Sequence, residues 1–179
     1  MSARPLVMFP DARLRDIAVP VTLFDDALKA LAVDLIDTMH AAGGIGITAP
    51  HIGIATRLVV LEMSPATGAQ IYANPRVLWA SDERIRHAEG SVSMPGVAAE
   101  IERPARVRVA YCDIIGAEQI EEADGLRAVC HQHEIDQLDG IFWLQKLSAL
   151  KRDQVIRRYQ KIGVATRRNA QPTPAITRR

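Results

Sequence analysis

Gln132–Gly140, which reads QHEIDQLDG, decides the fold of this chain because it sets a chemically active pair of side chains on a predicted helix. The helix is expected over residues 123–138, and the closing Asp-Gly of the stretch ends it. His133 and Gln137 are four residues apart, so they share one face of that helix. A His-Glu-x-x-His sequence would bring two imidazoles to one metal ion, with the glutamate as general base. This chain keeps Glu134 but has glutamine where the second histidine would stand.

Two further stretches, both containing glycines, precede this helix. Gly44–Gly53 (GIGITAPHIG) follows a predicted helix rather than a strand, so it is not a dinucleotide-binding fingerprint. Its glycines let a ligand approach the backbone closely, although turns use glycine just as often. Glu89–Gly96 (EGSVSMPG) is a short segment between predicted strands.

The rest of the chain predicts a mixture of helices and strands. A first helix starts at Asp25 and Asp26, carries apolar residues at helical spacing and stops at Gly43. A third helix is expected over residues 148–162. Strands are expected over residues 57–63, 71–72, 77–79, 84–88 and 105–113. The order helix, strands, helix, helix predicts an α+β fold with an antiparallel or mixed sheet.

The three stretches, in this order and at this spacing, resemble the signature motifs of the peptide deformylases, which read approximately GIGLAAPQ-V-G, EGCLS and QHExDHL-x-G. The segments Phe9–Arg15 and Ile141-Phe142 are similar to the start and the end of the family pattern. The resemblance covers about residues 3–162. It implies a single deformylase-like domain over residues 1–162, with antiparallel or mixed strands around a central HExxH-type helix.

The resemblance also implies an activity and a metal. Peptide deformylases hydrolyse the N-formyl group from the formylmethionyl ends of nascent peptides with a ferrous ion, which Zn²⁺ or Ni²⁺ can replace. The three metal ligands of the family fall at Ser91, His133 and Gln137. Its general base falls at Glu134, and its oxyanion-stabilising glutamine falls at His51. The residues at its substrate-binding positions are Ile45, Gly46, Gly90, Val92 and Cys130.

Two of the three metal-ligand positions depart from the family pattern. Ser91 replaces a cysteine, and a hydroxyl is far less acidic than a thiol, whose pKa is about 8.5. Gln137 replaces a histidine, and an amide oxygen suits hard ions such as calcium rather than Fe²⁺ or Zn²⁺. We therefore expect no tightly bound metal. We also expect impaired catalysis, because a water molecule beside Glu134 would lack a Lewis acid.

Several interpretations of Ser91 stay open at this point. Ser91 can be a structural hydroxyl that hydrogen-bonds Gln137, since buried polar groups find partners. It can belong to a weakened metal site that fills only at high metal concentration. It can also pair with His133 as a nucleophile, although its segment does not resemble a nucleophile elbow.

New ligands are another possibility for the metal site. His51, His131 or Cys130 would have to replace the missing groups. However, Cys130 has the pattern of a core thiol and His131 is expected at the surface. His40 and His87 are expected to be ordinary polar residues.

Two functional hypotheses follow from these motifs. The first is a binding or regulatory protein on the deformylase scaffold, which keeps the peptide groove but lacks efficient hydrolysis. The second is a genuine metal-dependent peptide deformylase with an altered site. The pair Ser91 and Gln137 favours the first hypothesis, whereas the retained Glu134 favours the second.

Charge and composition limit the partners and the compartment. A net charge of +1 over 179 residues gives no global case for a nucleic-acid binder, so no specific DNA binding is expected. Positive charge gathers on the third helix and on a tail over residues 163–179 that is expected to be disordered. The resemblance suggests that this basic helix contacts the ribosome. No apolar run reaches membrane-spanning length, and two cysteines without a CxxC pair fit a reducing cytoplasm.

Overall fold

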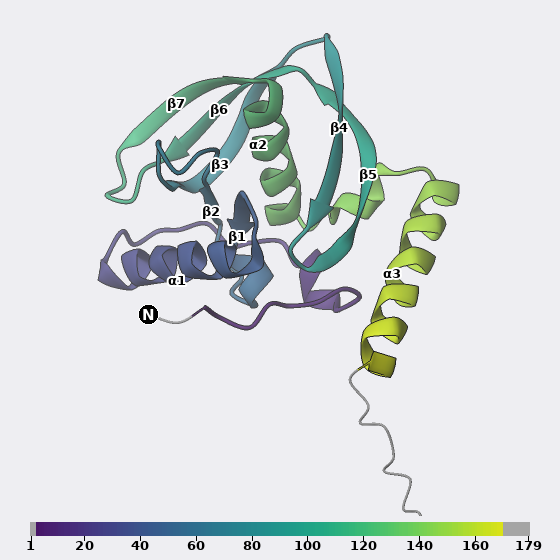
Figure 1. The fold of residues 1–179 in the computed structure, drawn as a ribbon. Helices are drawn as coiled ribbons and strands as arrows, with labels where there is room; N and C mark the ends of the chain where they lie inside the picture. The colour runs from purple at the N-terminus through teal and green to yellow at the C-terminus, as the bar shows by residue number, and fades with distance from the viewer. Residues whose placement is uncertain (1–2, 170–179) are drawn as a thin grey trace, which may run out of the picture.

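The computed structural model describes residues 3–169, which form an α+β fold of two antiparallel sheets and three α-helices (Figure 1). One sheet has five strands in the order β1-β2-β3-β6-β7, and the other is the pair β4–β5. The strands are β1 (Gly46–Thr48), β2 (Leu58–Leu61), β3 (Gln70–Ala80), β4 (Arg84–Ser91), β5 (Met94–Pro104), β6 (Arg106–Cys112) and β7 (Glu118–Asp124). The helices are α1 (Asp26–Ala42), α2 (Gly125–Leu138) and α3 (Ala149–Asn169), with 3-10 helices η1 (Ala12–Arg15), η2 (Ala49–Ile52) and η3 (Trp143–Lys146).

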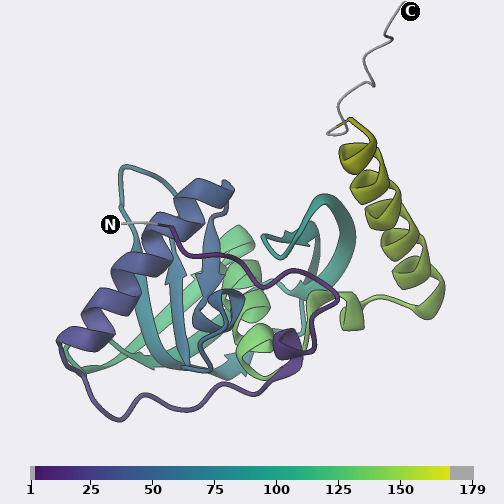
Figure 2. The ribbon, with the colours of Figure 1, turned by 90° about the horizontal axis from the view of Figure 1, so that it is seen from below.

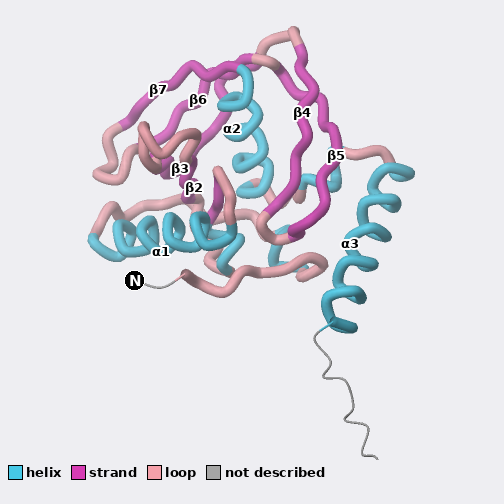
Figure 3. Tube along the Cα trace, in the orientation of Figure 1, coloured by secondary structure: helices cyan, strands magenta, loops and turns pink. Residues whose placement is uncertain are grey.

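Helix α2 lies at the centre of the molecule, between the two sheets (Figures 1 and 3). It contacts strands of both sheets, including β1, β3 and β7 on one side and β4 and β5 on the other. Its first residue, Gly125, has a φ of 50° directly after β7, so the chain turns from strand into helix without a linker. The helix ends at Leu138, as predicted. The predicted arrangement of strands around a central HExxH-type helix is confirmed.

Helix α1 packs on β1 and β2 and ends at the first motif. The Asp25 side chain begins the helix by accepting the Leu28 N–H at 3.0 Å. Leu35 and Met39 are fully buried in the core that α1 shares with the five-stranded sheet. Gly43 ends the helix in the left-handed conformation, with a φ of 67°. This stop delivers the chain directly to β1.

Strand β3 is continuous where the sequence predicts two separate strands on either side of Pro75. Register shifts interrupt its pairing with β6, and Asn74 takes a positive φ of 54°. The Asn74 side chain accepts the Val21 N–H at 2.7 Å and donates to the Val21 carbonyl at 2.9 Å. The irregular backbone at Asn74 therefore lets its side chain hold the backbone of Val21.

Residues 3–23, here called the N-terminal arm, run from the side of α1 toward α3 and back (Figure 2). The Val7 N–H donates to the His51 carbonyl at 2.8 Å, and the Phe9 N–H donates to the Ser93 carbonyl at 2.9 Å. The Leu14 carbonyl accepts the Gln137 amide N–H at 2.7 Å. The arm thus touches all three motif stretches.

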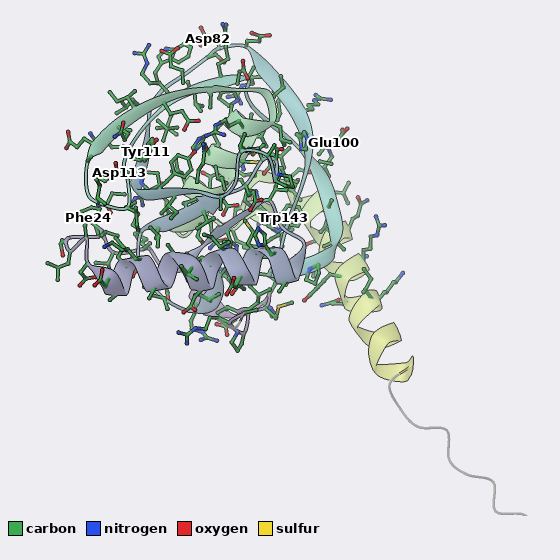
Figure 4. All side chains as sticks on the ribbon, turned by 60° about the vertical axis from the view of Figure 1, so that its left-hand side comes forward. Phe24, Asp82, Glu100, Tyr111, Asp113 and Trp143 are labelled. Carbon is green, nitrogen blue, oxygen red and sulfur yellow. The ribbon has the colours of Figure 1, made fainter. Side chains whose placement is uncertain are left out.

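Phe24 lies just before the first residue of α1 and packs against a turn of the five-stranded sheet. A Cβ atom on Gly116, in the turn between β6 and β7, would lie 3.1 Å from its ring. Figure 4 shows Phe24 below Asp113, at the end of β6. The Asp113 carboxylate shapes this turn by accepting the N–H groups of Ile115 and Ala117. The turn therefore packs on the start of α1 and anchors it to the sheet.

Helix α3 stands beside β5 at the edge of the molecule (Figures 1 and 2). Val155 is buried in the contact, and Ile162 lies against Gly96. The helix extends to Asn169, so the prediction that it ends at residue 162 is wrong. Residues 170–179 of the predicted tail lie outside the described part of the chain. No helix within residues 3–169 is long and apolar enough to cross a membrane.

Candidate active site

A pocket of about 370 Å³ opens between the first motif and the β4–β5 hairpin, with α2 forming one wall. Of the predicted site residues, those that line this pocket are Ile45, Gly46, His51, Gly90, Ser91, Val92, Cys130, His133 and Glu134. Gln137 is the exception. The structure therefore brings nine of the ten predicted residues to one pocket.

His133 is fixed by a buried carboxylate. Its Nδ1 lies 2.8 Å from Glu89 Oε2, so Nδ1 donates its hydrogen there and Nε2 remains for the pocket. Burial lowers the pKa of His133, but the bond to Glu89 and the charges of Glu134 and Glu89 outweigh burial and raise it. Burial likewise raises the pKa of Glu89, yet its bonds to His133 and Arg103 bring it below its usual value.

Arg103 is a buried cation that binds Glu89, the carboxylate that also binds His133. Its Nε lies 2.5 Å from Glu89 Oε1, and a terminal nitrogen lies 2.7 Å from Asp136 Oδ2. Its side chain is only 5% exposed, so the bidentate contact with Glu89 is shielded from water. Neither Arg103 nor Glu89 was predicted as a site residue, and Arg103 lies on β5, a strand that was not predicted. The only signal was that Glu89 opens the second motif.

His51 directs a hydrogen-bond donor into the pocket. Its Nδ1 accepts the Thr48 backbone N–H at 3.0 Å and lies 2.8 Å from the Thr48 hydroxyl. Burial and the charge of His133 lower the pKa of His51 to about 3, so the ring is neutral. A neutral ring whose Nδ1 accepts carries its hydrogen on Nε2. That Nε2 lies 3.4 Å from Ser91 Oγ.

Ser91 accepts one backbone hydrogen bond and makes one long contact with His51. Its Oγ accepts the Ser93 N–H at 3.2 Å and faces the His51 Nε2–H at 3.4 Å. A hydroxyl has two lone pairs and one hydrogen, so the Ser93 N–H takes one lone pair and the long contact with His51 faces the other. His51 cannot take that hydrogen, and within residues 3–169 no hydrogen bond joins Ser91 to His133. This geometry gives no support to a nucleophilic serine.

Gln137 points away from the pocket. Its amide nitrogen donates to the Leu14 carbonyl at 2.7 Å, and the side chain is buried with 2% exposed. The interpretation in which Ser91 hydrogen-bonds Gln137 is therefore wrong. The amide finds its partner in the N-terminal arm, because that carbonyl lies within reach on the same side of α2.

Glu134 lies buried against β1. A Cβ atom on Gly46 would lie 2.5 Å from Glu134 Oε1, so any larger residue here would displace the carboxyl group from this position. Glu134 Oε2 is buried and has no hydrogen-bond partner among the described residues. Burial raises the pKa of Glu134 to about 7, so acid and carboxylate coexist near neutrality.

The other candidate metal ligands, His131 and Cys130, are also poorly placed or poorly suited to bind a metal ion. His131 is 1% exposed and its Nε2 lies 3.3 Å from Glu121 Oε1, so its predicted surface position is wrong. It sits on the face of α2 that meets the five-stranded sheet, edge-on to Tyr72. Cys130 lines the pocket, but burial raises the pKa of its thiol to about 12. The thiol therefore stays protonated at neutral pH.

These residues do not fit a tightly bound transition-metal ion. His133 offers one nitrogen, Ser91 offers only a neutral hydroxyl, and Gln137 is turned toward the arm. In the part of the chain that the structure describes, no group of three or more His, Cys, Asp or Glu residues could hold a metal ion. Structural and catalytic zinc sites normally use three or four such ligands.

Further pocket residues were not predicted as site residues. They add an apolar wall from α2 and a polar rim from β4, and they include Leu126, Val129 and His87. Leu126 and Val129 stand one helical turn apart before His133, a spacing that the sequence shows but that core packing also produces. His87 lies at an exposed strand position and carries no distinctive sequence signal.

A His-Glu pair on a central helix, facing a pocket between two antiparallel sheets, defines a hydrolase scaffold of the HExxH type, here without the second histidine. The family model described as polypeptide deformylase matches residues 3–153. The chain belongs to the peptide deformylase family.

Individual relatives agree with this assignment. The chain is 63% identical over 162 residues to a peptide deformylase-like protein of Brucella melitensis, which covers 90% of this chain and 99% of the relative. It is 43% identical over 166 residues to a peptide deformylase of Brucella suis, covering 91% of this chain and 95% of the relative. The crystal structure of a Legionella pneumophila peptide deformylase superposes with a TM-score of 0.88 at 34% identity, covering 96% of this chain and all of that one.

Proposed function

We propose that this chain is a deformylase-like protein that keeps the peptide groove of its family, binds no transition metal tightly and hydrolyses formylmethionyl peptides weakly or not at all. The hydrogen bonding of Ser91 carries this proposal. Its oxygen is a neutral hydroxyl that already accepts the Ser93 N–H at 3.2 Å and has the His51 Nε2 at 3.4 Å, so it is a much poorer metal ligand than a thiolate. The position of Gln137, bonded to the arm, adds to the same conclusion.

The test is metal analysis and a deformylation assay on one preparation. Full-length protein purified without oxygen is expected to hold well under one equivalent of Fe, Ni or Zn. It is expected to release little formate from formyl-Met-Ala-Ser. Stoichiometric metal together with rapid deformylation would overturn the proposal.

A second candidate function is a genuine but slow peptide deformylase with an altered site. Glu134 favours it, because burial brings its pKa to about 7, where a general acid or base works best at neutral pH. His51 favours it too, since its Nε2–H supplies a donor at the position of the family glutamine. Measurable turnover that Glu134→Gln abolishes would establish this alternative.

The expected occupant of the groove is the N-terminal end of a nascent peptide. Two strand edges flank the pocket: β1 is an outer strand of the five-stranded sheet, and β4 belongs to a two-stranded sheet. An extended peptide can add to such edges through its own backbone groups. Gly46 and Gly90 lie on these strands and expose their backbone to the pocket.

A cytoplasmic location and contact with the ribosome complete the proposal. Exposed basic residues follow one another on α3, among them Lys151, Arg157, Arg158 and Lys161. Co-sedimentation with ribosomes is expected at low salt and should weaken as salt rises. The variant Arg157→Glu/Arg158→Glu should lose it. Absence of co-sedimentation at low salt would remove this partner.

A further inference from the structure

A second pocket, here called the arm pocket, lies where the N-terminal arm, η3 and the first half of α3 meet (Figure 2). Its volume is about 140 Å³. It shares no lining residue with the pocket of the candidate active site. Six of its ten lining residues are apolar, and two of the others are arginines. The arm pocket therefore combines an apolar wall with positive charge.

The apolar part of the arm pocket suits an aromatic ring. Phe9 and Phe142 stack there, with ring centroids 5.6 Å apart and ring planes inclined by 13°. Leu144 and Ile156 continue the apolar lining. An apolar cavity of about 150 Å³ in another protein holds benzene. The volume of the arm pocket is therefore that of a site for one ring.

Arg152 brings a positive charge without a carboxylate partner. Its Nε donates to the Leu144 carbonyl at 3.1 Å, and a terminal nitrogen donates to the Leu147 carbonyl at 3.2 Å. Both acceptors are neutral, and in the described part of the chain no acidic side chain pairs with Arg152. A guanidinium has five N–H groups, so three stay unused among residues 3–169. A partly buried charge of this kind favours a ligand of opposite sign.

Arg15 and Gln145 add exposed donors to the lining of the arm pocket. Within residues 3–169 no acidic side chain pairs with Arg15. Asp11 also lines the pocket, but its carboxylate accepts from Arg13 Nε at 3.1 Å and from a terminal nitrogen of Arg13 at 2.7 Å. The charge of Asp11 is therefore balanced by Arg13. The charges of Arg15 and Arg152 remain for a ligand.

We propose that the arm pocket binds an aromatic carboxylate. The ring lies among the apolar residues beside Phe142, and the carboxylate accepts N–H groups from Arg152 and Arg15. The planar guanidinium matches a carboxylate in shape as well as in charge. An inorganic anion would leave the apolar wall unfilled, and an aromatic amine would meet the arginines with the wrong sign. No bond is made or broken, so the ligand leaves as it entered.

A ligand in the arm pocket would touch the segment that borders the candidate active site. Phe9 and Leu14 both line the arm pocket. The Phe9 N–H donates to the Ser93 carbonyl, and the Leu14 carbonyl accepts the Gln137 amide. Occupancy should therefore hold the arm against the second and third motifs, because binding stabilises the conformation that binds. The inference does not depend on metal content or on hydrolysis at the candidate active site.

The test compares four probes on full-length protein: benzoate, benzamide, acetate and benzylammonium. Each is titrated at constant ionic strength, and the backbone NMR signals of Arg15, Leu144 and Arg152 are followed. Benzoate is expected to shift these signals saturably, because it alone combines the ring with a negative charge. It should bind at least about fivefold more tightly than each of the other probes.

The carboxylate can come from a free acid or from the end of a peptide chain. The probes 3-phenylpropionate and N-acetyl-Ala-Phe have the same spacing between ring and carboxylate, so they separate these sources. Tighter binding of the peptide assigns the ligand to a C-terminal aromatic residue. Tighter binding of 3-phenylpropionate assigns it to a free aromatic acid.

Two variants and a matched control locate the carboxylate. Arg15→Gln removes an exposed charge and should weaken benzoate binding about twofold to fivefold. Arg152→Gln should weaken it more, about fivefold to twentyfold, and denaturant unfolding shows whether this variant is folded. Arg158→Gln removes an exposed arginine of α3 that does not line the arm pocket, so it should leave binding unchanged.

Each contrary result counts against the inference. Absence of saturable benzoate binding, or equal binding of benzamide, acetate or benzylammonium, would overturn it. So would benzoate binding that ignores both Arg15→Gln and Arg152→Gln. Shifts confined to Gly90 and Val92 would place the ligand in the pocket of the candidate active site and would also overturn the inference. If Arg152→Gln does not fold, Arg15→Gln decides alone.

Discussion

Ser91 and Gln137 are both hydrogen-bonded to backbone groups, Ser91 to the Ser93 N–H and Gln137 to the Leu14 carbonyl. Each side chain therefore has a structural role, although neither is a good metal ligand. Restoring the family residue at only one of these positions changes a local hydrogen bond and still leaves the set of metal ligands incomplete. Metal binding should consequently respond to the pair of positions rather than to either alone.

The double variant Ser91→Cys/Gln137→His tests this coupling. It is expected to hold about one equivalent of a divalent transition metal after purification without oxygen, because a thiolate and a second imidazole join His133. Each single variant should hold far less. His51→Gln should add little, since His51 already directs an N–H into the pocket. Metal analysis decides the matter, and an equal gain from Ser91→Cys alone would contradict the coupling.

Gly46→Ala is expected to destabilise the fold by about 1–3 kcal/mol, the usual range for overpacking. The new methyl group would lie 2.5 Å from Glu134 Oε1 and 2.8 Å from a Leu61 methyl group. Denaturant unfolding measures the change in the free energy of unfolding. Gly163→Ala is the control, because nothing lies within 4 Å of its added methyl group and it sits inside α3. It should be neutral or stabilising.

Glu134 should also affect stability through pH. Burial raises its pKa from 4.5 to about 7 in the folded protein. The folded state therefore holds a proton that the unfolded state releases, and this contribution is complete below pH 4.5 and lost as the pH rises toward 7. The lowered pKa of His51 acts in the opposite direction at acid pH. The difference in unfolding free energy between wild type and Glu134→Gln, measured from pH 4.5 to 8, should fall as pH rises.

At the scale of single elements, predictions succeeded where a local signal existed. Helix α1 begins at the Asp25 cap and stops at Gly43, both visible in the sequence. Strand β7 was missed because its sequence EQIEEAD is mostly exposed at a sheet edge and shows no apolar alternation. Helix α3 runs past residue 162 because nothing at Gly163 stops it.

In the candidate site, too, features with a local sequence signal could be predicted and features without one could not. Residues of all three motif stretches line one pocket, although the roles predicted for them stay predictions. The direction of Gln137 was not predictable, because its partner at Leu14 lies 123 residues away in sequence. The hydrogen position on His51 depends in turn on Thr48, a contact that only three-dimensional geometry reveals.

The N-terminal arm should loosen when its bond to α2 is removed. Gln137→Met keeps the length of the side chain but cannot donate to the Leu14 carbonyl. A loss of about 1–2 kcal/mol in unfolding free energy is expected for one buried hydrogen bond. Hydrogen exchange should accelerate at the amides of Val7 and Phe9, which bond to the other two motif segments. Unchanged exchange there would show that the arm is held independently of Gln137.

At the scale of the whole molecule, the pocket is lined by segments that lie far apart in the sequence. The β4–β5 hairpin, the start of the five-stranded sheet and α2 each contribute lining residues. None of these elements alone surrounds a ligand. The buried line from Asp136 through Arg103 to Glu89 links α2 with both hairpin strands, so it keeps the parts in register.

The contacts of the N-terminal arm also bear on how the chain acquires its shape during synthesis. The arm is made first, yet its partners at His51, Ser93 and Gln137 emerge one after another, the last only when α2 is complete. Contacts between residues so far apart in sequence slow folding, because a long loop must close before they form. The arm is therefore expected to dock after the segments that it contacts have been made. A nascent chain that ends before α2 lacks both a wall of its pocket and the helix to which its own beginning is fastened.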